Sequence, residues 1–195
     1  MEREVFLIVG LGNPGDEYAH TRHNAGFDTM ERLAAHYGVT LRKKLLLNGR
    51  TAEADEGGAK VVLCEPLTFM NASGDFVSRA VNWYKVPLDH LLVIYDDIDL
   101  PPGRVRVRKN GGPGTHNGMR SIVERLGSSA FPRIRLGTGD RPAGEDLVNW
   151  VLGRPAPEER EAMGAAFDRA AACAVDWVRN GIDHAAQLGN QKTQD

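Results

Sequence analysis

Near its beginning the chain reads Val5-Phe6-Leu7-Ile8-Val9-Gly10-Leu11-Gly12-Asn13-Pro14-Gly15 and, a few residues later, Thr21-Arg22-His23-Asn24. The apolar run is short and ends at glycine, which predicts a buried β-strand. Apolar residues then recur at helical spacing from Phe27 to Tyr37, and Thr21 or Asn24 is placed to cap that helix. The loop between strand and helix holds two imidazoles, a guanidinium, an amide and a phenol. So much polar chemistry predicts a functional loop.

The glycines of this loop match the dinucleotide-binding pattern, Gly10-x-Gly12-x-x-Gly15. In that fold the helix already packs on the strand at the third glycine, whereas here Pro14 and a polar segment up to Asn24 prolong the loop. An acidic ribose ligand should also end a second strand about 20 residues further on, where this chain is predicted to be helical. We therefore reject this interpretation and expect no cofactor.

The composition fits one compact domain. The chain has 195 residues, of which 42% are hydrophobic, enough for a single α/β domain. We expect three layers over residues 1–186, with a twisted, mixed, mostly parallel central sheet flanked by helices, and a polar, disordered tail over residues 187–195. No long apolar run and no signal pattern is visible, so we expect a cytoplasmic monomer with no membrane contact. Neither Cys64 nor Cys173 has the spacing of a metal ligand.

Charge is unevenly distributed along the chain. Residues 104–141 hold nine basic and two acidic side chains, whereas the segment from Gly144 onward holds five basic and nine acidic ones. In Arg104-Val105-Arg106-Val107-Arg108 the strand period of two places three arginines on one face. Such a face attracts a polyanion, and we interpret it as a nucleic-acid or phosphate surface.

Several polar side chains follow predicted strands, where open α/β sheets place their ligands. They are Asn13 and His23, then Phe69 to Asn71 after a strand at Lys60–Cys64, Asp96 after a strand at His90–Tyr95, and Asn117 after a glycine-rich loop. No Gly-x-Ser-x-Gly elbow is present, so water is the expected nucleophile. A neutral histidine can take a proton from water while a carboxylate fixes its tautomer, and amides can stabilise an oxyanion.

Four motifs give the chain its strongest resemblance. They are Val9-Gly10-Leu11-Gly12-Asn13-Pro14-Gly15 with Tyr18 and Thr21-Arg22-His23-Asn24-Ala25-Gly26; Pro66-Leu67-Thr68-Phe69-Met70-Asn71-Ala72-Ser73-Gly74; Asp96-Asp97-Ile98-Asp99-Leu100-Pro101-Pro102-Gly103; and Gly111-Gly112-Pro113-Gly114-Thr115-His116-Asn117-Gly118. In this order the motifs resemble bacterial-type peptidyl-tRNA hydrolase, an esterase that frees tRNA from prematurely released peptides. The resemblance covers Glu4 to Gly181.

The resemblance implies roles for particular residues. His23 would be the general base, Asp96 would orient it, and Asn13 would recognise the peptide. The other implied residues contact the substrate: Tyr18, Phe69, Asn71 and Asn117, with Met70 lining the groove and Arg108 and Arg135 clamping a terminal phosphate of the tRNA. We expect no cofactor for this reaction. Thr115 replaces a usual glycine, and Pro113 stiffens the same loop, so the pose of Asn117 is the least secure of these expectations.

Two other functions stay open at this point. One is a non-catalytic RNA-binding module on the same fold, although such a module has no need of a base and its orienting carboxylate. The other is a metal-dependent hydrolase that uses His20, His23, Asp96 and Asp97, although this is not a recognised ligand pattern. His20 otherwise has no assignable role and is expected to pack in its loop. Gly139 to Glu145 is interpreted as a mobile lid.

Overall fold

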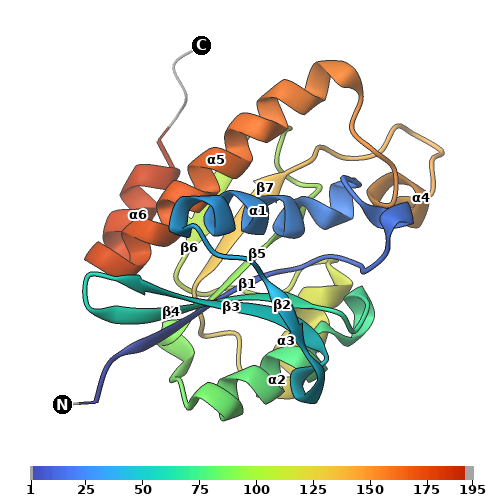
Figure 1. Ribbon diagram of the computed structural model, residues 1–195. Helices are drawn as coiled ribbons and strands as arrows, with labels where there is room; N and C mark the ends of the chain where they lie inside the picture. Colours follow the sequence, from blue (N-terminus) through green and yellow to red (C-terminus); the bar gives the residue numbers. More distant parts are fainter. Residues whose placement is uncertain (1, 192–195) are drawn as a thin grey trace.

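The computed structural model of the protein describes residues 2–191 and contains one seven-stranded sheet of order β2-β3-β4-β1-β5-β7-β6 (Figure 1). The strands are β1 (Val5–Gly10), β2 (Arg42–Lys44), β3 (Gly49–Glu56), β4 (Ala59–Pro66), β5 (Leu91–Asp97), β6 (Val105–Arg108) and β7 (Arg133–Gly137). The central strands β4, β1, β5 and β7 are parallel, while β2, β3 and β6 pair antiparallel towards the two edges. The expected mixed sheet with a mostly parallel centre is confirmed.

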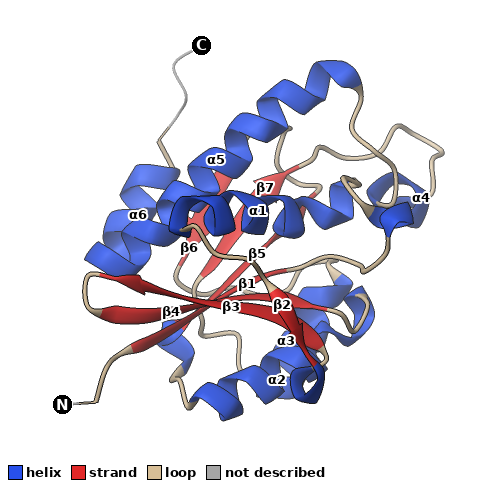
Figure 2. Cartoon of the chain, in the orientation of Figure 1, coloured by secondary structure: helices blue, strands red, loops and turns tan. Residues whose placement is uncertain are grey.

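Helices cover both faces of the sheet (Figure 2). On one face lie α1 (Ala25–Tyr37), α5 (Pro157–Asn180) and α6 (Ile182–Gly189), and on the other lie α2 (Ser73–Tyr84) and α3 (Asn117–Leu126); a short helix, α4 (Leu147–Val151), precedes α5. Each central strand is buried on both sides, so its side chains alternate between two cores. Ile8 of β1 packs towards α1 and α5, whereas Leu7 and Val9 pack towards α2 and α3. This is why β1 is continuously apolar.

The glycines after β1 serve helix packing. A Cβ atom on Gly26, in the first turn of α1, would lie 2.4 Å from the backbone nitrogen of Leu11, and one on Gly12 would lie 2.6 Å from the ring of Phe27. Helix α1 therefore lies directly against the end of β1. This contact explains Gly10 and Gly12 without a dinucleotide, and it brings the residues before α1 to the carboxyl end of the sheet.

The structure differs from the sequence predictions at two places. The sequence from Leu45 to Ala54 has a weak strand pattern and predicts one strand, but Leu45–Leu47 forms a 3-10 turn that ends at Asn48 with a φ of 55°, and β3 begins only at Gly49. The chain also stays ordered beyond residue 186. Helix α6 ends at Gly189, and the Asn190 side chain hydrogen-bonds both backbone groups of Val107.

The boundary of the expected tail is therefore wrong, and residues 192–195 of that tail lie outside the described part of the chain. Sequence reasoning missed α6 because its start, Gly181 with a φ of 88°, follows a long helix and reads as a simple end. Within residues 2–191, no helix combines the length and the apolar character needed to cross a membrane.

Candidate active site

A cleft of about 810 Å³ opens at the carboxyl ends of the parallel strands. All ten residues singled out from the sequence line it: Asn13, Tyr18, His23, Phe69, Met70, Asn71, Asp96, Arg108, Asn117 and Arg135. The loops after β1 and β4, the end of β5, the start of α3 and the strands β6 and β7 bring them together from distant parts of the chain. This position is the usual ligand site of open α/β sheets.

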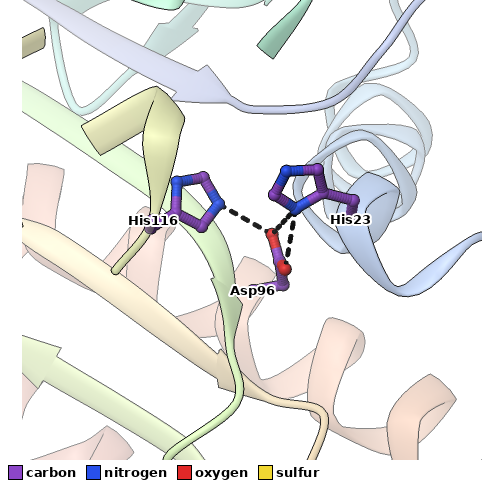
Figure 3. Close-up of side chains that lie close together, drawn as sticks. All are labelled: His23, Asp96 and His116. Carbon is purple, nitrogen blue, oxygen red and sulfur yellow. Dashed lines mark hydrogen bonds and ion pairs between the residues drawn. The ribbon is translucent and has the colours of Figure 1, made fainter. Parts of the chain in front are cut away.

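His23 and Asp96 form the centre of the cleft (Figure 3). His23 lies in a 3-10 turn, Arg22–Asn24, just before α1, and its Nδ1 is 2.9 Å from Oδ2 and 3.0 Å from Oδ1 of Asp96. Asp96 ends β5 and is 2% exposed. Because Nδ1 faces the carboxylate, it carries the proton, and Nε2 keeps a free lone pair. The arrangement leaves His23 able to accept a proton.

The charges of this pair depend on each other. Burial by itself raises the pKa of Asp96, but the two neighbouring imidazoles bring that pKa well below its usual range. Burial likewise lowers the pKa of His23, and the attraction and hydrogen bond of Asp96 outweigh it, so that the His23 pKa is raised. Asp96 is therefore ionised at neutral pH, and it stabilises the imidazolium that His23 forms on taking a proton.

His116 is the second imidazole on Asp96, and sequence reasoning did not single it out. Its Nε2 lies 2.9 Å from Oδ1 of Asp96, on the other side of the carboxylate from His23 (Figure 3). Its Nδ1 accepts a hydrogen bond from the backbone N–H of Met119, so His116 is the N-cap of α3. An acceptor Nδ1 requires the proton on Nε2. The position directly before the predicted helix, after a glycine-rich loop, was the available signal.

This tautomer bears on metal binding. The ligand atoms of His23, Asp96 and His116 lie within 4.8 Å of one another, close enough to resemble a metal site. A metal on Nε2 of His116 would require the proton on Nδ1, where it would oppose the N–H of Met119. The three side chains thus fit a chain of hydrogen bonds better than a metal ion.

The alternative metal set is not brought together either. His20 turns away from the cleft to bind Asp28 at 2.8 Å, and Asp97 pairs with Arg135. Neither His20 nor Asp97 reaches the group formed by His23 and Asp96.

Asn13 is held by its neighbours on both sides. Its Oδ1 accepts the backbone N–H of Met70 at 2.7 Å, while the Asn24 amide binds the backbone N–H and C=O of Asn13 at 2.8 and 3.0 Å. The orientation of the Asn13 amide follows from this, because its oxygen is used and its NH₂ group remains for a ligand. The sequence offered Thr21 or Asn24 as the cap of α1. Asn24 lies at the N-cap position, but its side chain makes no capping hydrogen bond, because it binds the backbone of Asn13 instead.

Comparisons with known proteins agree with this geometry. The family model described as peptidyl-tRNA hydrolase matches residues 7–195. Curated peptidyl-tRNA hydrolases from Chloroflexus aurantiacus and Caldanaerobacter subterraneus are 47% and 45% identical over 95% of this chain, and the matches cover 99% and 100% of their lengths. A crystal structure of peptidyl-tRNA hydrolase from Acinetobacter baumannii has a TM-score of 0.92 at 36% identity, covering 99% of this chain and 98% of that one.

The chain belongs to the peptidyl-tRNA hydrolase family. The resemblance found in its four motifs is confirmed over nearly the whole length.

On the basic side of the cleft, one of the arginines predicted from the alternating pattern is buried. Strand β6 pairs with β7 so that Arg106 lies opposite Arg135 and Arg108 opposite Arg133. Arg108 is exposed, and Arg135 pairs with Asp97 while still lining the cleft. Arg133 is 1% exposed, and its guanidinium donates to the carbonyls of Phe131 and Ser129. Both arginines of β7 line the cleft, but the hydrogen bonds of Arg133 to backbone carbonyls leave Arg135 as the better placed of the two to bind a ligand.

The opposite rim is apolar. Phe69 is half exposed with a φ of 62°, an uncommon conformation for a bulky residue, and its ring meets that of Tyr18 edge to face. Across the cleft, Leu147 and Val148 of α4 also line it. In Figure 1 the loop that was expected to be a lid, Gly139 to Glu145, leads into α4. The cleft therefore has a basic end beside β6 and β7 and an apolar end between Phe69 and α4.

Helix α4 is tied to the loop of His23. The Arg22 guanidinium lies 3.5 Å from the centre of the Trp150 ring and donates to the Trp150 carbonyl. The backbone N–H of Arg22 also donates to the carbonyl of Gly153. Arg22, the residue before His23, thus joins the loop of His23 to α4, the helix that lines the apolar end of the cleft.

Proposed function

We propose that this member of the family hydrolyses the ester that joins a peptide to the terminal ribose of tRNA, with water as the nucleophile and His23 as the general base. The observation that carries the proposal is the hydrogen bond from His23 Nδ1 to the buried carboxylate of Asp96. It fixes the tautomer that leaves Nε2 unprotonated, and it stabilises the imidazolium. A protein that only bound RNA would need neither group.

The reaction follows from these positions. Nε2 of His23 takes a proton as the water oxygen forms a bond to the ester carbonyl carbon. The carbonyl oxygen becomes an oxyanion, which the side-chain amides of Asn13, Asn71 and Asn117 stabilise by donating hydrogen bonds. The bond from carbon to the ribose oxygen then breaks, and the imidazolium returns its proton to that oxygen. The products are a peptide with a free carboxylate and a tRNA with a free terminal hydroxyl.

The two ends of the cleft match the two parts of this substrate. The guanidinium of Arg108 is free at the surface of β6, and Arg135, two residues along β7 from the partner of Arg108, lines the same cleft, so the tRNA phosphates bind there. The peptide extends past Asn13 towards Met70 and the aromatic pair of Tyr18 and Phe69. The enzyme acts as a monomer in the cytoplasm, where it recycles tRNA from prematurely released peptides and so rescues the products of stalled ribosomes.

The test is release of the blocked amino acid from an N-acetylated aminoacyl-tRNA, run beside the unblocked aminoacyl-tRNA. Cleavage of the blocked ester alone, unaffected by EDTA and lost in His23→Ala, is the expected result. Circular dichroism and tRNA binding of the variant show that it is folded. A folded wild-type protein that binds tRNA without cleaving the ester would favour the RNA-binding function, and inhibition by EDTA would favour the metal-dependent one.

A further inference from the structure

A second cleft, of about 400 Å³, lies on the other side of the loop that carries His23, between α1 and α5. The proposed reaction uses none of its residues. It is lined by His20, Thr21, Asp28, Arg32, Arg154, Pro155, Arg160, Met163, Gly164 and Phe167. Its walls hold three arginines and one buried carboxylate, and its floor is apolar.

The floor is kept open by a glycine in the middle of α5. Met163 and Phe167 are buried, and Gly164 lies beside Met163 in the interior of the same helix. A Cβ atom on Gly164 would meet only Nη2 of Arg32, at 3.9 Å, which is an ordinary contact. Packing therefore does not require glycine at this position, although glycine destabilises a helix interior relative to alanine. The space above this turn of α5 is open to a ligand.

Two arginines at the rim, Arg154 and Arg160, are held in place by hydrogen bonds to backbone carbonyls, and no carboxylate in the described part of the chain neutralises their charge. Arg154 donates to the carbonyls of Ala19 and Glu17, and Arg160 donates to that of Pro155. Within residues 2–191, neither Arg154 nor Arg160 forms a salt bridge. The Nε of Arg160 donates to Pro155, and its two terminal nitrogens, Nη1 and Nη2, donate to no protein group within that range. Two positioned cations at one mouth suit a phosphate group.

A hydrogen-bond acceptor lies deeper in the same cleft. Asp28 is 5% exposed, and its Oδ1 binds Nδ1 of His20 at 2.8 Å, which leaves Oδ2 for another donor. His20 holds this position with a φ of 62°, an uncommon conformation for a residue other than glycine. The Arg32 guanidinium lies over the ring of Phe167, 5.3 Å from its centre, and offers a flat surface beside the apolar floor.

We propose that this cleft binds a nucleotide unit, with its phosphate between Arg154 and Arg160 and its base against Arg32 and the apolar floor. An exocyclic amine of the base would donate to Asp28. Bases stack well on guanidinium planes, and a site that offers both donors and an acceptor matches a base better than a simple anion. The nucleotide comes either from the free pool or from the single-stranded end of a bound tRNA.

Calorimetric titration with AMP, adenosine and inorganic phosphate tests the site without any need for catalysis, so its result is independent of the proposed function. AMP should bind at least tenfold more tightly than either fragment. Gly164→Leu fills the floor with a good helix former, and Arg160→Ala removes one cation; each should weaken AMP binding at least tenfold. Arg42→Ala, an exposed arginine on the far edge strand, is the matched control and should bind AMP like the wild type.

A second arm separates the two sources of the nucleotide. If the ligand is part of tRNA, Gly164→Leu and Arg160→Ala should raise KM for N-acetylated aminoacyl-tRNA at least threefold while kcat stays the same. If it is a free nucleotide, KM should stay the same while AMP binding is lost. Thermal unfolding shows that both variants are folded. Unchanged AMP binding and unchanged KM in both variants would overturn the proposal, as would AMP binding that Arg108→Ala abolishes, since that would place AMP in the larger cleft.

Discussion

Nε2 of His116 lies 2.9 Å from the same Asp96 oxygen that Nδ1 of His23 approaches at 3.0 Å. One buried carboxylate therefore accepts hydrogen bonds from two imidazoles on opposite sides. The negative charge that raises the pKa of His23 is shared with a second, neutral donor. This sharing sets how strongly Asp96 stabilises the imidazolium that His23 forms on taking a proton.

His116→Asn tests this sharing. Asparagine remains a good N-cap for α3 but cannot reproduce the reach of Nε2, so Asp96 would act on His23 alone. The pKa of His23 should rise, and a base with a higher pKa loses its proton only at higher pH. The acidic limb of the profile of kcat/KM against pH should therefore move to higher pH. An unchanged limb would show that His116 only caps the helix.

Asp96→Asn should produce the opposite shift. The neutral amide no longer stabilises the imidazolium, so the pKa of His23 should fall and the acidic limb should move to lower pH. The amide also permits the wrong tautomer of His23, and kcat should fall by roughly 10²–10⁴. Single-turnover rates from pH 5 to 9 measure both effects. Nearly unchanged kcat in the folded variant would refute a role for Asp96 in orienting the base.

The sequence could predict that these residues come together, because each follows a strand or begins a helix in a pattern that can be read locally. Asn13, His23 and Asp96 lie where β1 and β5 end, and a parallel sheet brings such ends together. What could not be predicted depends on contacts between distant segments. His116 meets Asp96 only through the packing of α3, and the Arg133 guanidinium reaches the carbonyl of Gly112, in the glycine-rich loop before α3.

Contacts between distant segments also explain one of the two differences between the predicted and the observed secondary structure. The ordered end of the chain depends on hydrogen bonds from Asn190 to Val107, which are 83 residues apart, and no local pattern reveals them. The interruption before β3 depends on Asn48 adopting a positive φ, which asparagine tolerates but does not require.

Asp28 should make stability depend on pH. Burial raises the pKa of Asp28 to about 6, despite the opposing effect of His20. A folded-state pKa above the unfolded value means that the contribution is present in full below about pH 4 and is lost as pH rises through about 6. Asp28→Asn should therefore increase the free energy of unfolding at pH 7.5 by about 2–3 kcal/mol. It should also flatten the dependence of stability on pH between 4 and 6.

Urea denaturation at several pH values measures this effect. Asp89→Asn, at an exposed carboxylate before β5 that forms no salt bridge within residues 2–191, is the control and should change stability by less than about 0.5 kcal/mol. A lower stability of Asp28→Asn at pH 7.5 would mean that the hydrogen bond with His20 outweighs the cost of burial.

Gly26→Ala tests the contact between α1 and β1. The added methyl group would lie 2.4 Å from the Leu11 nitrogen and 2.5 Å from the Ile94 carbonyl oxygen, and neither backbone can move without disturbing the sheet. The variant should lose about 3 kcal/mol of stability. Gly112→Ala is the control, since a Cβ atom there meets nothing within 4 Å. Chemical denaturation compares the two, and equal stabilities would show that α1 can move away from β1.

Asn13→Asp separates two roles of Asn13, holding the backbone of Met70 in place and recognising the peptide. Aspartate keeps an oxygen for the backbone N–H of Met70, so the loop should stay in place, but it lacks the NH₂ group that faces the cleft. Asn13→Ala removes both groups and leaves the Met70 N–H unpaired, which should cost about 1–3 kcal/mol of stability. We therefore expect both variants to lose activity on N-acetylated aminoacyl-tRNA, but only the alanine variant to lose stability. If Asn13→Asp retained wild-type kcat/KM, the role of Asn13 would be confined to holding Met70, and recognition of the peptide would have to come from Asn71 or Asn117.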